Sequence, residues 1–114
     1  MPMIDAKLTV KLTAQQDQKV HEELTNAAAA ELHKPASYVM LSVEQGADLW
    51  MGGRKVAKGA YVHVRAFGGI ADADAAKLTA RITKFFEQGL GLDGAAVYIS
   101  YQGLNQWGWQ GSMF

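Results

Sequence analysis

The chain has 114 residues, with 11 basic and 11 acidic side chains, three histidines and no cysteine. Its net charge of zero argues against a nucleic-acid binder, whose affinity rests mainly on phosphate neutralisation, and against electrostatic binding to a membrane. The missing cysteine excludes disulfides, zinc–thiolate sites and thiol catalysis.

The length fits one domain over residues 1–114, and a hydrophobic fraction of 49% is enough to fill its core. The first residues lack the basic and apolar regions of a signal peptide, so we expect a cytoplasmic protein, with non-classical secretion left open. No stretch is long and apolar enough for a membrane span. The three histidines are scattered along the chain, so we expect no metal site and no cofactor.

The first half of the chain predicts a strand, a helix and a second strand. Residues Met3–Leu12 alternate between apolar and polar side chains, which is typical of a half-buried strand. Thr13 and Gln16 have the spacing of a capping box, so a helix is expected to begin there. Pro35 ends this helix, and Tyr38–Glu44 is the next predicted strand.

The second half repeats this order. Ala60–Phe67 is the third long strand, after a short apolar segment that ends at Gly52-Gly53. We expect a second helix capped by Asp72 or Asp74. The helix has a buried stripe of apolar residues and ends at two glycines: Ala75, Leu78, Ile82, Phe85, Phe86 and Leu90, with Gly89 and Gly91.

The last long strand is expected at Ala95–Tyr101. The tail from Gln102 to Phe114 contains two tryptophans and is too apolar to stay in water, so we expect it to dock on the rest of the chain.

The two halves, about 3–45 and 60–103, therefore form a tandem βαβ repeat. Each right-handed crossover pairs parallel strands, so the predicted fold is α+β, a two-layer arrangement. It has a four-stranded mixed sheet with both helices on one face. No remaining segment is long enough to cover the other face, so we expect further copies of the chain to cover it in a closed ring.

Pro2 has two interpretations. Proline is tolerated at the first position of a strand, where no ladder donor is needed. If Met1 is removed, however, Pro2 carries the terminal amine, whose ordinary pKa of about 7.7–8.0 suits a general base at neutral pH. If Met1 remains, the Pro2 nitrogen is an amide without useful basicity.

Lys34 is the second candidate residue. It immediately precedes the second strand, and Pro2 opens the first, so a parallel pair would bring both to the same end of the sheet. A neighbouring ammonium group would lower the pKa of the amine, and it could also bind a substrate carboxylate.

Several segments, in this order along the chain, resemble the macrophage migration inhibitory factor family of the tautomerase superfamily. The segments are Pro2-Met3-Ile4, Lys34-Pro35 with Tyr38-Val39, Gly52-Gly53, Phe67-Gly68-Gly69, Val97-Tyr98-Ile99 and Gly108-Trp109-Gln110-Gly111-Ser112-Met113-Phe114.

The resemblance implies a homotrimer with its sites at subunit interfaces, an amino-terminal proline as acid and base, and no cofactor. Pro2 matches that proline and Lys34 the substrate-binding lysine. Val64 aligns with an isoleucine whose backbone N–H contacts the ligand, and Tyr98 matches a tyrosine from a neighbouring subunit. The remaining matches are to residues that line the pocket: Met3, Tyr38, Trp109 and Phe114.

The sequence also departs from the family. Ser100 stands where the family has an asparagine that contacts the ligand, and the segment from Tyr98 to Trp109 is shorter. The Cys-x-x-Cys pair is missing, so thiol–oxidoreductase activity is not implied.

Two main functional hypotheses follow. The first is a keto–enol tautomerase acting on phenylpyruvate-like α-keto acids, with Pro2 and Lys34 as catalytic residues. The second is a trimeric binding or cytokine-like signalling protein whose tautomerase activity is incidental. A generic ferredoxin-like binding domain is a third alternative, but the neutral charge and the missing RNA-binding motif disfavour a nucleic-acid version.

Overall fold

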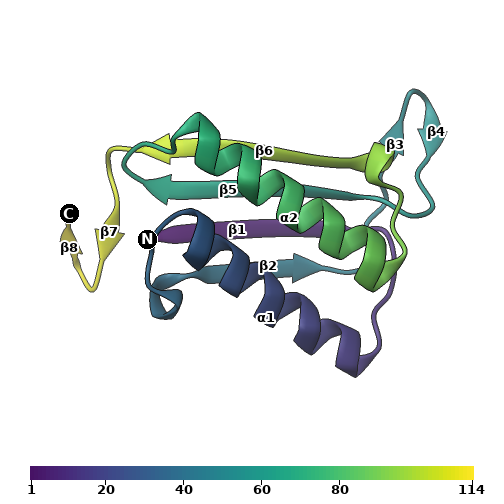
Figure 1. Ribbon diagram of the computed structural model, residues 1–114, viewed down its shortest axis with the longest axis horizontal. Helices are drawn as coiled ribbons and strands as arrows, with labels where there is room; N and C mark the ends of the chain where they lie inside the picture. Colours follow the sequence, from purple (N-terminus) through teal and green to yellow (C-terminus); the bar gives the residue numbers. More distant parts are fainter.

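The computed structural model describes all 114 residues and has two layers, helices on one side and a sheet on the other (Figure 1). The helices are α1 (Ala14–Glu31) and α2 (Asp72–Leu90). The sheet consists of β1 (Pro2–Leu8), β2 (Met40–Glu44), β5 (Ala60–Phe67) and β6 (Val97–Leu104). The predicted four-stranded mixed sheet with both helices on one face is confirmed.

The strand order in the sheet is β2-β1-β5-β6. Strands β1 and β2 are parallel, as are β5 and β6, while the two central strands β1 and β5 are antiparallel. The sheet is thus formed by two βαβ units joined through the β1–β5 pair. In this register Met3 lies between Met40 of β2 and Arg65 of β5.

The core lies between the sheet and the helices. Alternate residues of the two central strands are buried on this side, among them Ile4, Leu8 and Val62. The helices contribute Leu24 and Phe86, both fully buried. Period-2 burial in the strands and period-3.6 burial in the helices therefore meet in one apolar layer.

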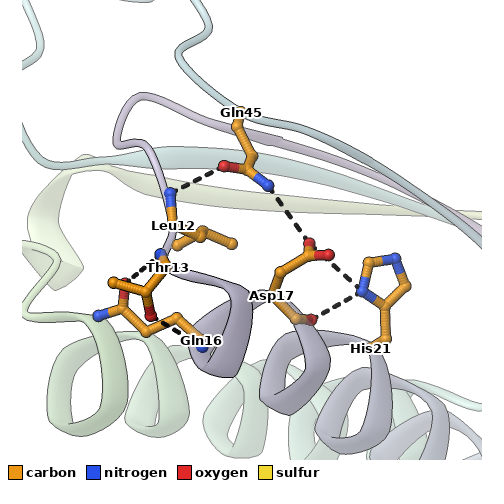
Figure 2. A network of polar contacts seen from close by, with 6 residues as sticks. All are labelled: Leu12, Thr13, Gln16, Asp17, His21 and Gln45. Atoms are coloured by element: carbon orange, nitrogen blue, oxygen red, sulfur yellow. Dashed lines mark hydrogen bonds and ion pairs between the residues drawn. The ribbon is translucent and has the colours of Figure 1, made fainter.

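Strand β1 is shorter than predicted, because it ends at Leu8 rather than Leu12. The Thr9 hydroxyl donates to the carbonyl of Ala57 (3.0 Å) and accepts from the backbone N–H of Gly59 (2.9 Å), which ties the end of the strand to the loop before β5. The N–H of Leu12 donates instead to the side-chain oxygen of Gln45 at 2.8 Å (Figure 2).

The predicted capping box at the start of α1 is confirmed. The Thr13 hydroxyl accepts from the N–H of Gln16 (3.1 Å), and the Gln16 side chain accepts from the N–H of Thr13 (3.0 Å) (Figure 2). Asp17 continues this network through its contacts with Gln45 (3.3 Å) and with the imidazole of His21 (3.5 Å).

Two strands begin later than predicted, because a short 3-10 helix precedes each. Residues Ala36–Tyr38 form η1, so β2 begins at Met40 rather than Tyr38. Residues Gly94–Ala96 form η2, in which the Asp93 side chain accepts from a backbone N–H. Strand β6 therefore begins at Val97 rather than Ala95 and continues to Leu104.

The predicted cap of α2 was wrong. Ala71 is the N-cap residue and makes no side-chain cap, while Asp72 and Asp74 lie in the first turn. Their carboxylates still stabilise the start of α2, because it is the positive end of the helix dipole. The helix ends at Leu90, and Gly91 follows it with a φ of 67°, in the left-handed region.

Two short hairpins complete the fold: β3 (Trp50–Met51) with β4 (Arg54–Lys55), and β7 (Gly108–Trp109) with β8 (Ser112–Met113). The second hairpin docks the apolar tail, because the Phe114 ring lies 5.2 Å from the Phe67 ring. Neither helix is sufficiently long and apolar to span a membrane.

The sheet face away from the helices carries mostly polar side chains, and no segment of the chain covers it (Figure 1). Arg65 pairs with Asp5 on this face, and the Ser100 hydroxyl bonds to both Tyr61 and His63 at 2.6 Å. The expectation that further copies of the chain cover this face stays a prediction.

Candidate active site

The N-terminal end of β1 opens into a cavity of about 800 Å³. Its wall is mostly apolar, which is typical of sites that bind small organic molecules. The lining side chains come from the chain start, α1, the η1–β2 segment, β5 and the tail: Met1, Pro2, Met3, His21, Thr25, Ser37, Tyr38, Val39, Met40, Leu41, Arg65, Leu104, Trp107, Gly108 and Trp109.

Pro2 is one of the residues that line this cavity. Its side chain is less than 2% exposed, and it pairs with Ala66 of β5. The amine next to it is that of Met1, and its pKa is lowered from 8.0 by burial and, to a smaller extent, by the charge of Lys34. The predicted meeting of the chain start and Lys34 at one end of the sheet therefore occurs in the structure.

The end of α1 places Lys34. His33 adopts a left-handed conformation with a φ of 57°, and the N–H of Lys34 bonds back to the carbonyl of Ala29 at 3.0 Å. This pattern is a Schellman motif, which ends the helix, and Pro35 then prevents the helix from continuing. Lys34 is not among the residues that line the cavity, but its charge acts on the terminal amine and it has no ion-pair partner in the chain, so it is available to a ligand.

Aromatic side chains form the outer wall. The Tyr38 ring meets the Trp109 ring edge-on with centroids 6.0 Å apart, and Trp109 stacks on Phe114 at 6.1 Å. Phe114 lies behind Trp109, against Phe67, rather than in the cavity wall. Of the three predicted aromatic pocket residues, Tyr38 and Trp109 therefore line the cavity and Phe114 supports Trp109.

The ligand contact expected for the backbone N–H of Val64 stays a prediction. The Val64 side chain is fully buried beneath the helices, and the residue pairs with Ile4, two positions after Pro2. The residue of β5 whose backbone lies beside the chain start is Phe67, whose N–H donates to the carbonyl of Met1 at 3.1 Å. The alternation of residues along β5 does not reveal which of them lies beside the chain start, because the pairing with β1 sets that register.

Tyr98 and Ser100 lie apart from this cavity. Tyr98 is 65% exposed and lines a second, smaller apolar hollow of about 320 Å³ with Trp50, Met51 and Tyr61. Because β5 and β6 run parallel, the beginning of β6 lies at the end of the sheet opposite Pro2. Within one chain, neither residue can join Pro2 in a site.

Several cavity residues were not among the predicted site residues, and the structure adds His21, Thr25, Arg65 and Trp107. His21 and Thr25 are four residues apart, so they share one face of α1. Arg65 could have been found only from the antiparallel register that places it opposite Met3. No group of three or more histidine, aspartate or glutamate side chains in the structure is arranged to hold a metal ion.

The sequence model of the macrophage migration inhibitory factor family matches residues 1–114. The chain belongs to this family. A sequence comparison with curated proteins gives no match.

Solved structures of similar proteins share the fold. Leishmania major MIF2 is 24% identical with a TM-score of 0.87, over 100% of this chain and 97% of that one. The macrophage migration inhibitory factor homologue from Prochlorococcus marinus is 27% identical with a TM-score of 0.83, over 98% of each chain. A fused 4-OT protein, a symmetric trimer, is 19% identical with a TM-score of 0.79, over 90% of this chain and 85% of that one. Membership of the family places the chain in the tautomerase superfamily.

Proposed function

We propose that this protein is a cofactor-independent keto–enol tautomerase acting on phenylpyruvate-like α-keto acids. The observation that carries the proposal is the position of the chain start, in a largely apolar cavity beside the unpaired ammonium group of Lys34. After removal of Met1, the secondary amine of Pro2 would occupy this place.

A neutral amine is the form that this chemistry needs. The pKa of the terminal amine of Met1 is already lowered by burial and by Lys34. The Pro2 side chain is buried more deeply, so desolvation should disfavour its charged form as well. A lower pKa leaves a larger fraction of the amine unprotonated at neutral pH and ready to accept a proton.

In the proposed reaction, the Pro2 nitrogen takes a proton from the enol oxygen, or from the carbon next to the keto group, and returns it to the other of these two atoms. Lys34 binds the substrate carboxylate, and Met3, Tyr38 and Trp109 hold the ring. Positioned proton transfer of this kind contributes a rate increase of roughly 10²–10⁴-fold.

We further propose that the chain forms a homotrimer with sites between subunits. Tyr98 is too exposed for a lone chain and lies at the end of the sheet opposite Pro2, so a neighbouring copy would have to supply it to the site. The fused 4-OT protein, a symmetric trimer with a similar fold, supports assembly into a trimer. Ser100 would approach the site from the same neighbouring strand, but its hydroxyl already bonds to Tyr61 and His63.

The second candidate function is a trimeric binding or cytokine-like signalling protein, and it depends on Met1 staying on the chain. The Pro2 nitrogen is then an amide, and the Met1 carbonyl accepts the N–H of Phe67. A chain that kept Met1 would retain the cavity but lose the proposed base.

The test is an assay of phenylpyruvate ketonisation on wild type, Pro2→Gly and Lys34→Ala, with intact-mass analysis of each preparation. We expect wild type to lack Met1 and to be active, and Pro2→Gly to lose most of that activity. Equal rates in all three proteins would refute the mechanism, and an inactive wild-type trimer that keeps Met1 would favour the binding function.

A further inference from the structure

The inference concerns Arg65, the only lysine or arginine in the cavity wall. It lies on β5 directly opposite Met3 and lines the same cavity as Pro2. No aspartate or glutamate lines this cavity. The rest of the wall is mostly apolar and aromatic, with His21, Thr25 and Ser37 as its other polar side chains. A guanidinium group in such a wall is a feature that a ligand can recognise, because charge–charge contacts strengthen as water is excluded.

Arg65 is held in place from one side. Its Nη1 donates to Asp5 Oδ2 at 2.5 Å, and the two side chains are 36% and 40% exposed. A guanidinium group has five N–H donors in a fixed fork. The bond to Asp5 is the only hydrogen bond that the Arg65 side chain makes within the chain. Asp5 lies outside the cavity wall, so it orients the arginine and leaves most of its donors free.

Arg65 and Lys34 differ in their surroundings. Lys34 has no acidic partner and acts on the pKa of the terminal amine, whereas the charge of Arg65 is balanced by Asp5. Tuning of the amine therefore falls to Lys34. The role that remains for Arg65 is to bind an anionic group through its planar fork, which matches a carboxylate better than a lysine does.

We propose that Arg65 binds a second carboxylate of the substrate, so that the preferred substrates are α-keto acids with two carboxylates, one for Lys34 and one for Arg65. This inference rests on the proposed tautomerase function and narrows its substrate class. Arg65 takes no part in the proton transfer, since Pro2 alone carries the proton between the enol oxygen and the carbon next to the keto group. Arg65 is a specificity residue.

The kinetic test compares oxaloacetate, which has two carboxylates, with phenylpyruvate, which has one. In wild type we expect the higher kcat/KM for oxaloacetate. Arg65→Gln should raise the KM for oxaloacetate about 10-fold or more relative to the KM for phenylpyruvate, because a charge-assisted contact with the second carboxylate is lost. Arg65→Lys should restore part of the loss. Arg54→Gln, on the exposed β4 hairpin, is the matched control and should match wild type.

A binding test gives a result even without turnover. Calorimetric titration with glutarate and with butyrate should show tighter binding of the dicarboxylate to wild type, and Arg65→Gln should remove that difference. The double variant Asp5→Asn/Arg65→Gln avoids an unpaired carboxylate and should behave like the single variant. Circular dichroism checks that each variant is folded.

Failure of this inference can be distinguished from failure of the proposed tautomerase function. If wild type does not prefer glutarate, or if Arg65→Gln weakens both ligands equally, the inference is wrong whatever the enzyme does. If wild type ketonises neither keto acid, the proposed function fails, and the glutarate titration still decides whether Arg65 binds a second carboxylate.

Discussion

Replacing Lys34 by alanine should weaken substrate binding markedly. No acidic side chain of the protein pairs with this lysine, so a bound substrate carboxylate would be its main partner. A hydrogen bond to a charged group contributes about 1.5–3 kcal/mol, and each 1.4 kcal/mol is a factor of ten. Because Lys34 is partly exposed, solvent screening favours the lower end, and we expect the KM for phenylpyruvate to rise about tenfold.

The same substitution should change the pH dependence. Lys34 lowers the pKa of the terminal amine, so its removal raises that pKa. The reaction needs the unprotonated amine, and a higher pKa leaves less of it at any pH below that value. The acidic limb of kcat/KM should therefore move to higher pH in Lys34→Ala.

The assay follows ketonisation of enol-phenylpyruvate by ultraviolet absorbance across the range of about pH 5 to 9, which spans the ordinary pKa of an α-amino group. Lys77→Ala is the matched control, because Lys77 is an exposed helix lysine away from the cavity. An unchanged KM together with an unmoved acidic limb would refute the role given to Lys34.

Three further predictions concern stability. Thr13→Ala removes the hydroxyl that accepts from the N–H of Gln16 and should lower the free energy of unfolding by about 1 kcal/mol in a urea titration. Gly103→Ala would place its Cβ 2.4 Å from the carbonyl oxygen of Gly68, so we expect a loss of roughly 1–3 kcal/mol and a lower thermal midpoint; an unchanged midpoint would contradict the packing at this point. Burial raises the pKa of Tyr101 above its ordinary value of 10.0. The unfolded chain then ionises first, so stability should fall as pH rises above about 10, and Tyr101→Phe should remove part of that fall.

The order of strands and helices followed from the sequence because local signals agreed with one another. Alternation at Ile4, Ala6 and Leu8 matches their burial against the helices. The capping box at Thr13 is a purely local interaction, so it could be predicted with its partner. Pro35 marked the end of α1 for the same reason.

Strand ends and side-chain partners depended on contacts distant in sequence. The alternation of β1 continues to Leu12, but Thr9 bonds to residues about 50 positions away and ends the strand. Ser100 is likewise fixed by Tyr61 and His63 of the neighbouring strand. Such contacts require the register, which local periodicity does not contain.

The residues of the candidate site also differ in whether the sequence alone could place them. Pro2 and Lys34 could be placed together because parallel strands begin at one end of a sheet, and the lowered pKa of the terminal amine agrees with that placement. Arg65 could not be placed at the site from the sequence, because only its antiparallel pairing with Met3 brings it to the cavity.

The most direct test of the proposed mechanism compares chains that keep Met1 with chains that lack it. A preparation that retains Met1 is treated with methionine aminopeptidase, and intact mass and phenylpyruvate ketonisation are measured on the same samples over time. The mechanism predicts that activity rises in proportion to the fraction of chains that begin at Pro2. Equal activity before and after removal of Met1 would contradict it, because an amide nitrogen at Pro2 cannot serve as the base.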